Sequence, residues 1–184
     1  MNNPLLTQEK IMKLIVSLWS CVLALFTVQG IHAEEKTTTS TSSINWLTSY
    51  EEAVNKASSA KKPMILFFTG SDWCGWCKRI EQEAFDTPEF ASAAGDKFVF
   101  VKLDFPLYHP VPQQQTEQNK QLKQKFDIRG FPTLIILDDQ QQKIGVTGYR
   151  PGGGSAYAEH LLKMVHDYQG YKQKLSALDS KALS

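Results

Sequence analysis

Two cysteines separated by only two residues, Cys74 and Cys77, are the first candidates for chemistry in this sequence. They stand between an apolar run, residues 64–68, and a segment whose apolar residues recur at helical spacing. Cysteines at positions i and i+3 in the first turn of a helix lie on one side and can form a disulfide without backbone movement. The helix N-terminus also favours the thiolate, the reactive form of cysteine. The spacing therefore predicts a redox-active pair, with Cys74 attacking and Cys77 resolving.

Two other uses of a close cysteine pair are less well supported. Half of a zinc site would need further ligands, but there is no second pair, and His109, His160 and His166 show no ligand spacing with the motif. A structural disulfide would close so small a loop that it would stabilise little. We therefore expect a dithiol–disulfide cycle with no metal and no bound cofactor. A thiol metallochaperone, or a redox-inactive binding domain, is the alternative from another functional class.

The first 33 residues have the pattern of a secretory signal. Lys10 and Lys13 precede an uncharged apolar run at 14–28, and Ala33 is the small residue after which cleavage is expected. The run is short for a membrane span, and an uncleaved anchor is the alternative. Cys21 lies inside this run and is interpreted as one of its small apolar residues rather than as a lipid-attachment site. The sequence thus predicts an exported protein.

Composition indicates one globular domain behind this signal. The 184 residues are 42% hydrophobic and 21% charged. Residues 1–33 hold two of the 20 basic and one of the 19 acidic residues, so the remainder has 18 of each. A neutral chain without a basic stripe is not expected to bind nucleic acid. Residues 34–45 read as a flexible Ser/Thr-rich linker, and 46–184 as the domain, with a short polar tail from about 171.

The domain is predicted to alternate helices and strands. The elements expected in chain order are a helix from Trp46, a strand at 64–68, a helix from the cysteines to Phe85, a short helix capped by Thr87, a strand at 97–105, a helix at 116–126, strands at 133–139 and 143–149, and a last helix capped by Ser155. Three prolines in residues 106–115 predict a long loop. This order implies an α/β fold with helices on both faces of a central mixed sheet, closed by a hairpin and a C-terminal helix.

With these elements in this order, the sequence resembles the thioredoxin superfamily and, within it, the Dsb-type periplasmic thiol:disulfide oxidoreductases. The resemblance rests on WCGWCK after a buried strand, FVFVKLD as the next strand, RGFPT before the hairpin, and the terminal helix, over about residues 46–169. It implies a thioredoxin fold and a monomeric protein-disulfide reductase in the periplasm. Its partners would be exported proteins with cysteines and a membrane electron donor of DsbD type. A disulfide oxidase or isomerase of the same fold is the alternative.

The resemblance also assigns residues around the cysteines. It implies a cis peptide at Phe131–Pro132 facing them, with the Phe131 backbone pairing with an extended substrate. A proline that merely starts an edge strand is the alternative. Trp73, Gly75 and Trp76 would form the rest of the substrate-binding surface, although Trp76 could instead join the core.

Three features depart from the family pattern. The buried acid that serves many thioredoxins as a proton relay aligns with Phe68, so the relay must come from elsewhere. Lys102 is the candidate, although its side chain could simply reach solvent. Gly75–Trp76 stands where a typical thioredoxin has Gly-Pro, which leaves the redox strength open. The loop at 106–115 is long for its position and could shape the substrate groove.

Overall fold

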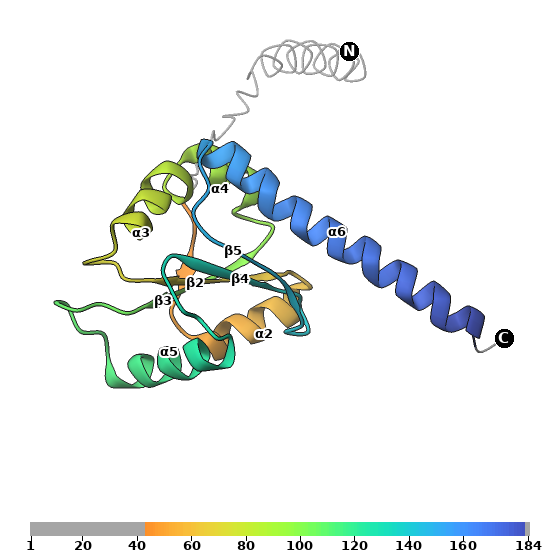
Figure 1. Cartoon of the computed structure of the whole chain (residues 1–184), viewed down its shortest axis with the longest axis horizontal. Helices are drawn as coiled ribbons and strands as arrows, with labels where there is room; N and C mark the ends of the chain where they lie inside the picture. The colour runs from red at the N-terminus through yellow and green to blue at the C-terminus, as the bar shows by residue number, and fades with distance from the viewer. Residues whose placement is uncertain (1–42, 183–184) are drawn as a thin grey trace, which may run out of the picture. The chain divides into compact units, whose positions relative to one another are not determined.

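The computed structural model describes residues 43–182, which form a five-stranded sheet with helices on both faces (Figure 1). The strands are β1 (Trp46–Leu47), β2 (Met64–Thr69), β3 (Val99–Asp104), β4 (Thr133–Leu137) and β5 (Lys143–Thr147). They lie in the order β1-β3-β2-β4-β5. β3 is parallel to β1 and β2, whereas β4 is antiparallel to β2 and β5. This is the mixed sheet with a terminal hairpin that the sequence predicts.

The helices divide between the two faces of the sheet (Figure 1). One face is covered by α2 (Tyr50–Ala60) and α5 (Gln113–Lys125), and the other by α3 (Gly75–Ile80), its π-helical continuation η1 (Glu81–Phe85), α4 (Pro88–Ala94) and α6 (Gly153–Ala182). All residues of β2 are buried, as expected of a central strand covered on both sides. β2 leads directly into the turn that carries the cysteines.

Aromatic rings fill the core beneath α3 and η1. Phe85 lies edge-on to Trp46, Phe67, Phe90 and Tyr157, with ring centroids 5.2–5.6 Å apart. Edge-on aromatic pairs contribute about 0.5–1.5 kcal/mol each beyond their burial. This cluster holds the helix that carries Cys77 against β2.

The N-terminal part of the domain differs from the prediction. The sequence predicts a helix from Trp46, but Trp46 and Leu47 form β1 because they pair with β3. The helix begins only at Tyr50, after Ser49, whose side-chain oxygen accepts the backbone N–H of Glu52. That cap satisfies one of the free N–H groups of the first turn.

Two later helices also begin earlier than predicted. α5 starts at Gln113, directly after the last proline of the preceding loop, so the loop spans residues 106–112. α6 starts at Gly153 rather than after a Ser155 cap. A side chain on Gly154 would clash with Thr87, so the helix approaches α4 closely at this point. α6 continues to residue 182, so the residues from about 171 are helical.

The predicted signal and most of the predicted linker lie outside the described residues. Between residues 43 and 182, the structure contains no helix with both the length and the apolar character needed to cross a membrane.

Candidate active site

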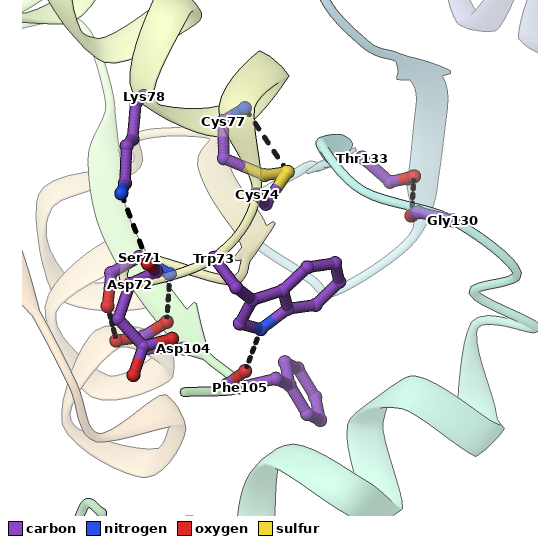
Figure 2. The surroundings of a disulfide bond; sticks show 10 residues. All are labelled: Ser71, Asp72, Trp73, Cys74, Cys77, Lys78, Asp104, Phe105, Gly130 and Thr133. Carbon is purple, nitrogen blue, oxygen red and sulfur yellow. Dashed lines mark hydrogen bonds between the residues drawn. A yellow bond between two sulfur atoms is a disulfide. The ribbon is translucent and has the colours of Figure 1, made fainter. Parts of the chain in front are cut away.

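Cys74 and Cys77 form a disulfide at the N-terminus of α3, with their Cα atoms 5.2 Å apart (Figure 2). Cys74 is the N-cap of the helix, and its Sγ accepts the backbone N–H of Cys77 at 3.2 Å. Cys74 retains 6% of its surface exposed, whereas Cys77 is fully buried. Only Cys74 can therefore be reached by the sulfur of another molecule. In the reduced protein, the same N–H and the helix dipole would stabilise a thiolate at Cys74.

Trp73 forms a wall on one side of the disulfide (Figure 2). Its indole Nε1 donates a hydrogen bond of 2.8 Å to the backbone oxygen of Phe105, just beyond β3. The indole lies against Gly70, where any side chain would collide with it. Trp73 is nevertheless 42% exposed. Its ring is thus held in place while part of its surface remains available to a substrate.

Trp76 stands on the first turn of α3 and is 54% exposed, so it is not a core residue. Its ring lies 5.0 Å from that of Tyr149, and the Arg79 guanidinium lies over both rings at 5.3 and 5.4 Å. Glu83 accepts hydrogen bonds from Tyr149 at 2.6 Å and from Arg79 at 2.7 Å. These two hydrogen bonds hold the pKa of Glu83 below its ordinary value. Trp76 therefore belongs to a surface cluster with Tyr149, Arg79 and Glu83, whose contacts hold its ring in place.

The surface near the disulfide is completed by Gly75 and by the loop before β4. A side chain on Gly75 would meet nothing within 4 Å, so this part of the surface is open. The Phe131–Pro132 peptide bond is cis, as the resemblance implies. The Phe131 ring lies 5.8 Å from that of Trp73, edge-on. The fold thus brings the cis-proline loop against the cysteine motif, although the two are far apart in the sequence.

Lys102 lies on β3 and forms an ion pair with Glu81, with 2.8 Å between Nζ and Oε1. Glu81 follows Cys77 by one helical turn, and its backbone N–H donates to the Cys77 carbonyl. Phe68, which aligns with the family's buried acid, faces the α2 side of the sheet, and Phe67 occupies the cysteine side. The carboxylate on the cysteine side therefore comes from η1 and not from β2. Sequence reasoning missed Glu81, although its i+4 spacing from Cys77 was a usable signal.

Asp72 ties the loop at 106–112 to the cysteine motif. Its carboxylate accepts the backbone N–H groups of Leu107, Tyr108 and His109 at 2.7–3.1 Å. Desolvation alone would raise the pKa of Asp72, but these three donors outweigh it and hold the pKa below its ordinary value. The long loop is therefore attached two residues before Cys74.

The three histidines of the described residues form no metal cluster with Cys74 and Cys77. His109 belongs to the loop held by Asp72, and His160 and His166 lie on α6. Over the described part of the chain, no group of three or more His, Cys, Asp or Glu side chains is placed to hold a metal ion.

Comparisons with known proteins agree with this geometry. A family model described as a thioredoxin-like domain matches residues 50–163. The disulfide bond reductase DsbH of Chlamydia pneumoniae is 34% identical over 141 residues, which span 77% of this chain and 84% of that protein. A solved structure of a DsbH oxidoreductase matches with a TM-score of 0.64 and 35% identity, over 67% of this chain and 85% of that one.

A second relative is much longer than this chain. The thiol:disulfide interchange protein DsbD of Photorhabdus laumondii is 33% identical over 113 residues, which span 60% of this chain but 18% of that protein. The matches and the cysteine geometry lead to one conclusion. The chain belongs to the thioredoxin-like family, among its Dsb-type thiol–disulfide oxidoreductases.

Proposed function

We propose that this protein reduces disulfide bonds in exported proteins of the periplasm through Cys74 and Cys77. The observation that carries the proposal is the placement of the pair, with a slightly exposed Cys74 capping α3 and a buried Cys77 one turn behind it. Similarity to a disulfide bond reductase, DsbH, favours reduction over oxidation. The signal-like pattern of residues 1–33 supports export.

The reaction takes place in two steps. The Cys74 thiolate attacks one sulfur of a substrate disulfide, and the other substrate sulfur leaves as a thiolate that takes up a proton. Cys77 then loses its proton and attacks Cys74 Sγ, which breaks the mixed disulfide and releases the second substrate thiol. Two electrons have passed to the substrate, and the protein holds the Cys74–Cys77 disulfide. Similarity to DsbD supports a membrane reductant of DsbD type as the donor that restores the dithiol.

The second step needs a proton acceptor close to the buried Cys77. Our candidate is the Glu81 carboxylate, which is paired with Lys102 and lies one helical turn after Cys77. Lys102, the relay candidate from the sequence, acts here by keeping Glu81 in position through their ion pair. The proposed cycle uses no bound cofactor.

The substrate segment lies over the open surface at Gly75, between Trp73 and Trp76. The backbone of Phe131, next to Pro132, pairs with the extended substrate chain as an added strand. The two tryptophans supply rigid apolar contact area on either side of Cys74, which is the kind of side chain that dominates protein interfaces. The protein acts as a monomer.

A glutathione redox titration of residues 34–184, followed by tryptophan fluorescence, tests the direction of the reaction. Trp73 and Trp76 flank the disulfide, so their emission should report its state. A potential near the −270 mV of thioredoxin fits a reductase, whereas one near −120 mV would make the protein an oxidant. A Cys77→Ser variant should accumulate mixed disulfides with exported proteins. If none forms, catalysis by this pair is refuted.

A further inference from the structure

A cavity of about 410 Å³ opens beside Trp73, beyond the cysteine pair. The loop at 106–112 and the end of β3 form one wall, α5 forms another, and Trp73 and Phe131 are shared with the active site. Its volume is at the small end of the ~300–1,000 Å³ of ligand sites in proteins. The cavity therefore has room for one or two amino-acid side chains and is continuous with the surface around Cys74.

The walls of this cavity are fixed to the cysteine motif. Asp72 holds the loop through three backbone N–H groups, and the Trp73 indole is bonded to the carbonyl of Phe105. On the α5 side, the buried Asn119 amide donates to the backbone oxygen of Asp104 at 2.9 Å. Hydrogen bonds within the protein therefore hold the walls of the cavity in place without a bound partner.

The lining combines apolar surface with positive charge. Leu107, Pro110 and Val111 contribute apolar groups from the loop. From α5, Lys120 and Lys123 lie on the face that lines the cavity. Lys120 is an exposed residue that pairs with Glu117 at 3.4 Å, so its ammonium stands at the rim.

Lys123 is the more distinctive of the two cations. Its Nζ lies 5.6 Å from the ring centroid of Phe105 and 5.4 Å from that of Phe131. Within residues 43–182, the partners of this ammonium are aromatic rings and not a carboxylate. A cation in that position is available to an acidic group that enters the cavity mouth.

We propose that this cavity is a substrate-specificity site, which receives a large apolar side chain of the polypeptide whose disulfide Cys74 attacks. An acidic residue next to that side chain binds Lys123 and Lys120. The inference rests on the proposed function, and it names the class of substrate as protein segments in which apolar and acidic residues flank the cysteine. Leu107 and Tyr108, which are 67% and 72% exposed on the loop, would be covered by the same segment.

Four synthetic peptide disulfides test this proposal. They share one cysteine context and differ only in a flanking Phe or Ala and a flanking Asp or Lys. We expect kcat/KM to be at least about ten-fold higher with Phe than with Ala, because the apolar side chain is buried in the cavity. Asp should be preferred over Lys by about two- to five-fold, as for a partly exposed ion pair. Each rate is divided by the rate with 2-hydroxyethyl disulfide, a small uncharged disulfide without an acidic or large apolar group, which reports the cysteine chemistry alone.

Three variants test which residues cause the preferences for Phe and for Asp. Val111→Trp fills the cavity and should abolish the preference for Phe, and Leu107→Ser, at an exposed position, should weaken it without a folding risk. Lys123→Glu should reverse the preference for Asp. The matched control is Lys125→Glu on the same helix, since Lys125 lies over the rings of Tyr50 and Phe126 and away from the cavity. This control should keep both preferences.

The outcomes separate the inference from the proposed function. Equal turnover of all four peptides would overturn the specificity site and leave the oxidoreductase intact. The site is also overturned if the variants slow the peptides and 2-hydroxyethyl disulfide by the same factor, because the effect would then lie at the cysteines. A protein that reduces none of these disulfides would refute the proposed function and the inference together.

Discussion

Replacing Glu81 by glutamine should slow the attack of Cys77 on the mixed disulfide without slowing the first attack by Cys74. Glu81 stands one helical turn after Cys77 and pairs with Lys102 at 2.8 Å. Glutamine keeps the shape of the side chain but does not accept a proton. Because Cys77 is fully buried, water does not replace Glu81 as the acceptor of its proton, and we expect the second step to slow.

The size of the effect follows from the ionisation of a thiol. A cysteine with the ordinary pKa of about 8.5 is about 3% ionised at pH 7. Without a base, the second step depends on at most that fraction, because burial in apolar surroundings raises the pKa of a thiol, so the rate should fall by about 30-fold or more at pH 7. The loss should shrink as the pH rises to 9, because a larger fraction of the thiol is then ionised.

The same substitution has a cost in stability that must be measured separately. It leaves Lys102 without its ion-pair partner, and the two side chains are 30% and 19% exposed. Breaking a fully buried pair costs about 3–5 kcal/mol. For this partly exposed pair we expect a smaller loss of unfolding free energy, about 1–2 kcal/mol, which urea denaturation can determine.

Rapid acid quenching and mass spectrometry, from pH 6 to 9, would measure the two steps. The variant should accumulate more of the mixed disulfide at Cys74 at pH 7 than at pH 9. Glu89→Gln, at an exposed position on the neighbouring helix α4, is the matched control and should behave as the unaltered protein does. If the folded Glu81→Gln variant resolves its mixed disulfide at the unaltered rate at pH 7, Glu81 is not the proton acceptor.

Three further predictions follow from other contacts. Asp72→Ala should free residues 107–109, which faster amide exchange and proteolysis there would show. In the unaltered protein the pKa of Asp72 is lowered, so the attachment is fully present above the ordinary carboxyl pKa and is lost as the pH falls through the lowered pKa. Phe85→Ala should lower the unfolding free energy by about 3–5 kcal/mol in urea, because the ring is buried among four others. Trp76→Ala should raise KM for protein disulfides several-fold with little change in stability, since the residue is half exposed; an unchanged KM would remove it from the substrate surface.

The sequence predicted the parts of this protein that depend on local spacing. The cysteine pair at a helix start and the order of the helices and strands after residue 49 follow from residues close together in the chain. Trp46 and Leu47 were misjudged because their spacing from Tyr50 also fits one face of a helix. Only their pairing with β3, more than fifty residues away, makes them a strand.

Glu81, the proton acceptor that we propose, was missed for a related reason. Family alignment directs attention to β2, where Phe67 and Phe68 leave no acid on either face. The carboxylate instead comes from the helix, and its place beside β3 depends on the ion pair with Lys102. A gapless alignment compares positions along the chain, whereas a proton relay depends on where the carboxylate lies in space.

The turn at residues 70–74 connects the cysteine pair to the substrate surface that we propose (Figure 2). Gly70 gives room to the indole, Ser71 binds Asp104, Asp72 binds the loop, Trp73 binds the Phe105 carbonyl and Cys74 caps α3. Four of these five contacts are made without the disulfide, to the end of β3, to the loop that follows it or within the turn. Because these contacts do not involve sulfur, we expect them to persist when the disulfide is reduced. The Trp73 side of the proposed substrate surface should then keep its position relative to Cys74 through both steps of the cycle, while only the bond between Cys74 and Cys77 changes.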